Sequence, residues 1–164
     1  MNVWHLRTVA AANERNGVWV TWPATGWRFR VARLCDWNKA YAEALVRIAQ
    51  EPETAAYIER AREKDYKRTA ADDAIDARLQ LRAFGEGCVL DWERVIGPDG
   101  DAFSHTPAHV FQLLEHFADL AAFLRKFAAD EKNFARYTEG EQRELALGNS
   151  PGVSNTSRLN GIHF

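Results

Sequence analysis

The segment that decides the fold is Cys88–Phe134, which reads CVLDWERVIGPDGDAFSHTPAHVFQLLEHFADLAAFLRKFAADEKNF. It opens with an apolar run that ends at Trp92, and residues 97–100 then read Gly-Pro-Asp-Gly, which is typical of a turn. Thr106 can accept a hydrogen bond from an amide of a first helical turn. Pro107 suits the first helical position because an amide there would lack a partner anyway. The order of these features along the chain predicts an apolar anchor segment, then a turn, then a helix with a capped N-terminus.

After this cap, apolar residues recur at spacings of three and four, which predicts a helix over residues 106–136. The pattern is equally compatible with two helices that meet near His116–Asp119. The apolar stripe is wide. It therefore either forms the core or is partly reserved for another chain.

Upstream of this segment, the sequence predicts an antiparallel β-hairpin over residues 17–34. Two runs rich in aromatic and β-branched residues, 18–22 and 27–31, flank the loop Pro23–Gly26. In the second run the apolar side chains alternate with arginines, so they share one face of a strand. We expect this apolar face to lie against helices.

Three charged segments between the hairpin and Cys88 show helical periodicity. Thr69, with Asp72 three residues later, resembles a capping box in which Asp replaces Glu. Gly85 and Gly87 are expected to end the third helix. The predicted helices cover residues 36–50, 52–64 and 69–84, and they are opened by Asp36, Pro52 and Thr69.

Composition places the chain among globular proteins, because 46% of its 164 residues are apolar and 12% are aromatic. The predicted fold class is α+β and mainly α-helical, with an N-terminal antiparallel β-hairpin packed on a bundle of about five helices. Residues 1–137 are expected to form a single globular domain. Residues 138–164 are rich in Gly, Ser and Asn towards their end, which predicts a C-terminal tail that is mobile from about residue 148.

The charge balance argues against a nucleic-acid partner, since the formal net charge is -2 and acidic and basic residues are interspersed. The sequence offers only short basic candidates, such as Arg28, Arg30 and Arg33. The two cysteines, Cys35 and Cys88, predict reduced thiols. No signal peptide or long apolar run is present in the sequence, so we expect a cytoplasmic protein with no membrane partner.

The best metal candidates are His105, His109 and His116, because positions 109 and 116 would share one side of a continuous helix. The set is weak, since His105 precedes the helix and no HExxH spacing is present. Neither a nucleophile motif nor a phosphate-binding glycine loop occurs. We therefore expect no metal, no cofactor and no enzymatic activity.

The order of features resembles that of the tail assembly chaperones of long-tailed, siphovirus-type bacteriophages and their prophages. The resembling elements are GVWVTW and WRFRVARL, the helix DWNKAYAEAL, the segment VLDWERVIGPDGDAFSHTP and the helix rich in Leu and Phe. Together they span roughly residues 17–134. The resemblance implies an N-terminal hairpin and a mostly helical body without a catalytic motif.

The same resemblance implies a function in virion assembly. Members of that family bind the tape measure protein, help to recruit tail tube subunits and are commonly absent from the mature virion. Many also have a longer form made by frameshifting. On this basis we expect contacts with the tape measure protein or with a second copy of the chain, in the host bacterial cytoplasm. The candidate contact residues are Phe111, Leu114, Phe123, Phe127, Leu159, Ile162 and Phe164.

Two other functions remain open at this point. One is a different phage or mobile-element accessory protein, such as an inhibitor of host defence or a tail-completion subunit, acting by protein–protein binding. The other is a metal-dependent enzyme built on the three histidines. The position of the gene, next to tail tube and tape measure genes or elsewhere, would separate the first from a chaperone.

Overall fold

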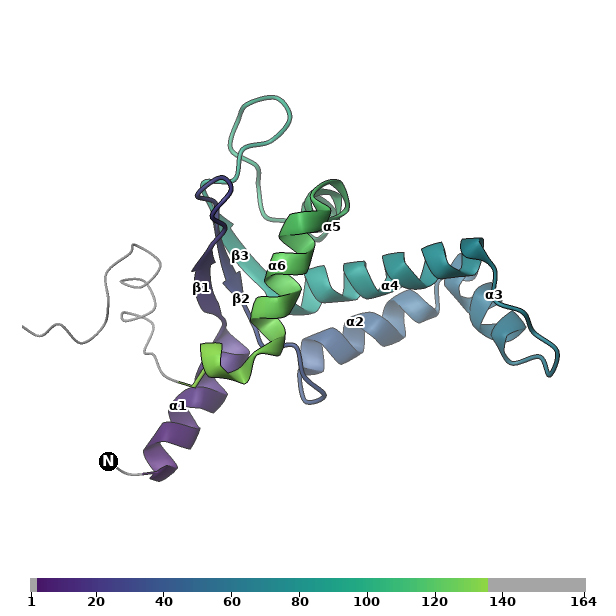
Figure 1. Cartoon of the computed structure of the whole chain (residues 1–164), viewed down its shortest axis with the longest axis horizontal. Helices are drawn as coiled ribbons and strands as arrows, with labels where there is room; N and C mark the ends of the chain where they lie inside the picture. Colours follow the sequence, from purple (N-terminus) through teal and green to yellow (C-terminus); the bar gives the residue numbers. More distant parts are fainter. Residues whose placement is uncertain (1–2, 136–164) are drawn as a thin grey trace, which may run out of the picture.

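The computed structural model describes residues 3–135, and the side chains of residues 3–9 are outside this description. The fold is α+β and mainly helical, with an antiparallel three-stranded sheet near one end (Figure 1). In chain order the elements are α1 (Val3–Asn16), β1 (Val18–Thr21), β2 (Arg28–Val31), α2 (Lys39–Ala49), α3 (Pro52–Ala61), α4 (Ala70–Cys88), β3 (Val89–Glu93), α5 (Pro107–His116), α6 (Ala118–Ala129) and a 3-10 turn, η1 (Glu131–Asn133).

The predicted hairpin is confirmed, because β1 and β2 pair antiparallel and Val20 lies opposite Phe29. Its loop is closed by a hydrogen bond of 2.8 Å from the Trp22 amide to the Trp27 carbonyl oxygen. The apolar run that ends at Trp92 is a third strand, β3, which pairs antiparallel with β2 and places Trp92 opposite Phe29. Strand β2 is therefore the centre of the sheet.

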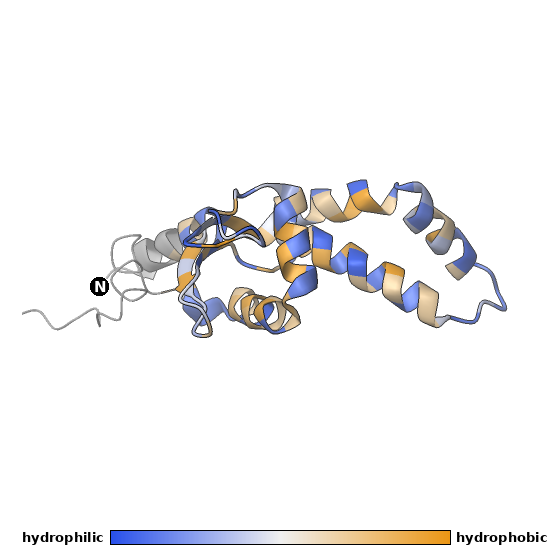
Figure 2. Cartoon of the chain, turned by 90° about the horizontal axis from the view of Figure 1, so that it is seen from above, coloured by the Kyte–Doolittle hydropathy of each residue, from blue (hydrophilic) through white to orange (hydrophobic). Residues whose placement is uncertain are grey.

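One face of the sheet packs on helices, as the alternation in β2 predicts. Phe29 and Val31 are fully buried and belong to one cluster with Phe84 of α4 and Leu124 of α6. Figure 1 shows α6 in front of the sheet and α5 near its upper end, and Figure 2 shows hydrophobic residues concentrated in this part. The main core lies between the sheet, the end of α4 and the α5–α6 pair.

Helices α2 and α4 run side by side away from the sheet, with α3 at their far end; we call these three helices the arm (Figure 1). They are antiparallel, because Tyr41 near the start of α2 packs on Gly87 near the end of α4. A second, smaller apolar cluster of Ala44, Ile48, Leu79 and Ala83 joins α2 to α4.

Two predicted helix limits in the arm are wrong. Helix α2 begins at Lys39 and not at residue 36, because the side chain of Asn38, rather than that of Asp36, caps it by accepting a hydrogen bond of 3.0 Å from the Tyr41 amide. The second helix ends at Ala61 instead of residue 64, and its C-cap amide, that of Arg62, bonds to the carbonyl oxygens of Glu59 and Arg60.

The other two differences concern the longest helices. Helix α4 does not end at Gly85 but continues to Cys88, because both glycines lie where neighbouring helices approach closely. The predicted helix over 106–136 is divided at Phe117, whose φ of -113° and ψ of 82° are not helical. The alternative of two helices that meet near His116–Asp119 is therefore the one observed.

The caps of α4 and α5 agree with the sequence. Thr69 and Asp72 form the predicted capping box, and the Thr106 side chain accepts a hydrogen bond of 3.2 Å from the His109 amide. The predicted tail, 138–164, lies outside the described residues. Among the described helices, none has the length and apolar character needed to cross a membrane.

Candidate functional site

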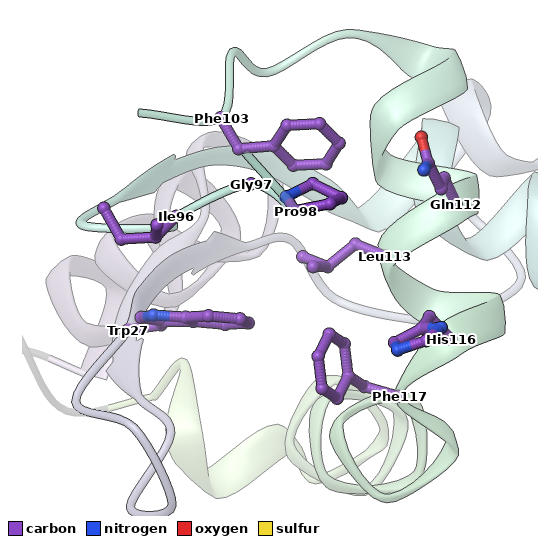
Figure 3. A pocket seen from close by; sticks show the side chains of 9 residues that line it. All are labelled: Trp27, Ile96, Gly97, Pro98, Phe103, Gln112, Leu113, His116 and Phe117. Atoms are coloured by element: carbon purple, nitrogen blue, oxygen red, sulfur yellow. The ribbon is translucent and has the colours of Figure 1, made fainter. Parts of the chain in front are cut away.

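An apolar pocket of about 390 Å³ opens between the β1–β2 hairpin, the loop after β3 and helix α5. Figure 3 shows the side chains of its walls arranged around one hollow. Most of these side chains are aromatic or aliphatic, and the polar ones come from α5. The lining residues are Trp27, Ile96, Gly97, Pro98, Phe103, Gln112, Leu113, His116 and Phe117.

The loop wall of the pocket is fixed by the turn that the sequence predicts. The Gly100 amide donates to the Gly97 carbonyl oxygen at 3.0 Å, and Gly100 adopts a φ of 86°, which glycine tolerates without strain. The Phe103 amide donates to the Val95 carbonyl oxygen at 2.9 Å and closes the loop. Ile96 therefore stays at the mouth of the pocket, where 47% of its surface is exposed.

Phe103 is held from behind by the core. Its ring stacks on Trp92 with 5.8 Å between centroids and 7° between planes, and its carbonyl oxygen accepts a hydrogen bond of 2.6 Å from the Trp92 indole. The ring of His109 also stacks on Phe103, with 4.2 Å between centroids. This wall is consequently rigid.

The opposite wall is formed at the junction of α5 and α6. Phe117, the residue that divides the two helices, meets Trp27 edge to face with 5.5 Å between centroids and 89° between planes. It also meets the buried Trp22 at 5.9 Å. The helix break thus turns an aromatic ring towards the hairpin and completes the pocket.

The lining of the pocket combines apolar walls with two polar side chains. Gln112 and His116 are exposed, and they offer a donor and acceptor pair beside apolar walls. A mostly apolar hollow with a few convergent polar groups is typical of sites that take an apolar ligand group. An aliphatic or aromatic side chain of a partner fits this description.

The three candidate histidines are separated by different contacts. His105 Nε2 lies 2.9 Å from the Val89 carbonyl oxygen, and His109 Nδ1 lies 2.8 Å from the Ser104 carbonyl oxygen. His116 instead packs against Phe117 at the pocket. Within residues 10–135, no three His, Cys, Asp or Glu side chains are grouped as metal ligands would be.

The two cysteines differ in environment. Cys88 is fully buried, and burial raises the pKa of its thiol to about 12. Cys35 is half-buried, and burial also raises its pKa. Both thiols are therefore protonated at neutral pH, the form that is a poor nucleophile.

The short basic cluster of the hairpin is engaged inside the protein. Arg28 is 7% exposed, its guanidinium bonds to Glu93 at 2.6 Å, and it lies over the Trp19 ring at 5.1 Å. Arg33 pairs with Glu14 at 3.4 Å. The guanidinium groups of Arg28 and Arg33 are thus already paired within the protein.

The predicted partner-binding residues fall into three groups. Leu114 is 1% exposed and belongs to the main core, so its surface is already used inside the protein. Phe123 and Phe127 are partly buried against the same core, and Phe111 is half-buried beneath Arg78. The remaining three residues, Leu159, Ile162 and Phe164, lie outside the described part of the chain.

The sequence reasoning missed most of the pocket. Trp27 was expected on the apolar face that lies against helices, and it does pack against the main core; its position just before β2 also makes it part of the pocket lining, which was not foreseen. Ile96 could have indicated the pocket, because it is a β-branched apolar residue directly before a turn that projects into solvent.

The fold and the pocket define a small α+β protein with an apolar pocket and a charged helical arm. A family model described as YdaY prophage protein matches residues 38–148, which is more than half of the chain. The chain therefore belongs to this family of prophage proteins. The match includes the arm, β3 and both helices at the pocket, and it begins after the hairpin. No curated protein and no solved structure matches the chain.

Proposed function

We propose that this prophage protein is a non-enzymatic tail assembly chaperone that binds the tape measure protein and helps to recruit tail tube subunits. In this proposal it acts in the host bacterial cytoplasm without a cofactor and is absent from the mature virion. The observation that carries the proposal is the open apolar pocket beside α5. The prophage family and the layout of hairpin, arm and Phe-rich helices support it.

The pocket suits one anchor residue of a helical client. Apolar side chains on one face of an amphipathic helix commonly provide such anchors, and a hollow with aromatic walls desolvates the anchor on entry. Trp27 and Phe117 supply one wall and Phe103 supplies another. A long helical client offers many such anchors in succession, so several copies of the chaperone can bind it.

The test is Ile96→Glu in the full-length protein, expressed together with the tape measure protein of the same prophage. Ile96 is 47% exposed, so the change places a charge at the mouth of the pocket with little effect on folding. We expect the amount of tape measure protein that co-purifies to fall by at least about tenfold, as for an interface hot spot.

Val46→Glu is the matched control. Val46 is also a β-branched residue, it is 61% exposed, and it lies on α2, which does not line the pocket. Its co-purification should equal that of the unaltered protein. If Ile96→Glu binds the tape measure protein as well as Val46→Glu does, the pocket is not the client site and the proposal fails. A partner identified instead as a host protein would favour an accessory protein that inhibits host defence.

A further inference from the structure

A second depression, of about 360 Å³, lies on the other side of α5 from the pocket. Helix α5 separates the two, because residues 112, 113 and 116 face the pocket while residues 114 and 115 face the groove. We call this depression the α4–α6 groove. It is lined by Ala77, Arg78, Leu81, Leu114, Glu115, Ala118, Ala121, Ala122 and Arg125.

Its shape admits an α-helix. Four of the lining residues are alanines; Ala121 is buried, whereas Ala77, Ala118 and Ala122 are exposed. The groove is lined by α4, α6 and two residues of α5, and the side chains of packed helices form ridges against which a third helix can lie at an axis separation of about 8–10 Å. Short side chains at the base of the groove permit that approach.

The charge on the walls of the groove determines which side chains a bound helix would need. The Arg78 guanidinium lies 5.7 Å from the centre of the Phe111 ring, and that of Arg125 lies 5.6 Å from the centre of the Phe84 ring. Stacking on a ring fixes a guanidinium while leaving donors at its edge for another group. One cation therefore stands on each wall.

These two cations are weakly compensated by the described part of the chain. Arg78 approaches Glu115 at 3.9 Å, a pair in which both side chains are more than half exposed. Arg125 forms no ion pair with the residues that the structure describes. The groove is apolar at its base and net positive on its walls.

We propose that the α4–α6 groove binds one amphipathic α-helix of a partner protein, with a narrow ridge of small apolar residues flanked by acidic side chains. The ridge contacts the alanines, and the acidic residues pair with Arg78 and Arg125. Identification of this partner helix with the client rests on the proposed function, whereas the binding preference does not. The groove thus selects a partner helix by its charge, whereas the pocket selects an apolar anchor residue.

The experiment uses two synthetic helical peptides of ~20 residues with an identical Ala and Leu ridge, one flanked by Glu and the other by Lys. Binding to the full-length protein is measured by fluorescence anisotropy. We expect the Glu peptide to bind at least about tenfold more tightly than the Lys peptide, and the double variant Arg78→Glu/Arg125→Glu to reverse this order. Arg62→Glu/Lys67→Glu makes the same change in net charge near α3 and should leave the order intact.

Ala122→Trp tests the groove without a change of charge, since the indole fills the hollow from an exposed position. It should abolish binding of the Glu peptide while circular dichroism and the melting temperature stay unchanged. Equal binding of both peptides, or binding of the Glu peptide that survives Ala122→Trp, overturns the proposal for the groove. If the Glu peptide binds as expected while no tape measure protein co-purifies, the groove stands and the proposed function fails. If the tape measure protein co-purifies but the Glu peptide does not bind, only the proposal for the groove is overturned.

Discussion

The sheet end of the molecule and the far end of the arm are stabilised in different ways. At the sheet end, the most buried side chains are apolar: Phe29, Phe84 and Leu124 are at most 1% exposed. In α3 and the first turn of α4, the most buried side chain is that of Asp72, at 2%. Figure 2 shows the same contrast, since the loop from α3 to α4 is hydrophilic throughout.

Besides the apolar cluster that joins α2 to α4, directional polar contacts connect the helices of the arm. Arg82 bonds to both oxygens of Glu51 at 2.6 and 2.8 Å, and this pairing lowers the pKa of the Glu51 carboxyl. Arg47 of α2 pairs with Glu86 of α4. Such contacts depend on charge state and geometry, whereas the core depends on volume. The two ends should therefore respond to different substitutions.

The largest expected effect is at the sheet end. Phe84→Ala removes a buried aromatic ring that packs in the main core and supports Arg125. We expect the free energy of unfolding to fall by about 4 kcal/mol, because both the transfer energy of the ring and the contacts around the cavity are lost. Urea denaturation followed by circular dichroism measures this change.

Phe111→Ala is the matched control on α5. Phe111 is half-buried and contacts Arg78, so its loss should cost less than half as much. An equal cost at the two positions would mean that the core does not extend as described.

The second-largest loss of stability is expected at Gly87 of α4, and Gly85 on the same helix provides the comparison. A Cβ at Gly87 would lie 2.4 Å from Tyr41 Cα and 2.6 Å from Tyr41 N, so α2 and α4 would have to separate. A Cβ at Gly85 would meet side-chain atoms first, Val110 Cγ1 at 2.9 Å and Leu114 Cδ1 at 3.4 Å. We expect Gly87→Ala to cost about 2 kcal/mol.

Gly85→Ala should cost less than half of that, because the better helix propensity of alanine offsets the side-chain crowding. Thermal and urea unfolding of both variants give the comparison. If Gly85→Ala proves the more costly, the contact between α4 and α5, and not that between α4 and α2, sets the position of the arm.

These glycines also show where sequence reasoning stopped. Gly85 and Gly87 look like a helix end because glycine favours C-caps, but their role is close packing with residues more than twenty positions away in the chain. The Thr69 and Thr106 caps were predictable because each cap depends on residues within one turn. These two caps were therefore readable from the sequence, whereas the close helix contacts at Gly85 and Gly87 were not.

The same limit applies to the pocket. Its turn was predicted from Gly97–Gly100, but its walls combine a hairpin end, a loop and a helix junction that meet only in the fold. The break at Phe117 has no proline or glycine to announce it. Leu114 was predicted as a contact residue because periodicity locates the apolar stripe of a helix. Periodicity does not show which part of that stripe is buried by the rest of the fold.

The smallest effect is expected at the far end of the arm, at Asp72. The Tyr66 hydroxyl, the Arg60 guanidinium at 2.9 Å and the Thr69 cap face this carboxylate and hold its pKa well below its usual range. Asp72→Asn keeps an acceptor for the Thr69 amide but removes the charge. We expect the melting temperature at pH 7 to fall by about 3 °C.

The pH dependence separates the charge of Asp72 from its size. Because the pKa is lowered in the folded state, the carboxylate stabilises the fold above the unfolded-state pKa of about 4, and this contribution is lost as the pH falls below that value. The difference between Asp72→Asn and the unaltered protein should therefore be constant from pH 8 to about pH 5 and shrink below about pH 4. Asp73→Asn, which removes an exposed carboxylate paired with Arg68 in the same turn, should lower the melting temperature less. A difference that stays constant down to pH 2 would show that Asp72 acts through its shape, and the polar account of the arm would then be wrong at its most buried residue.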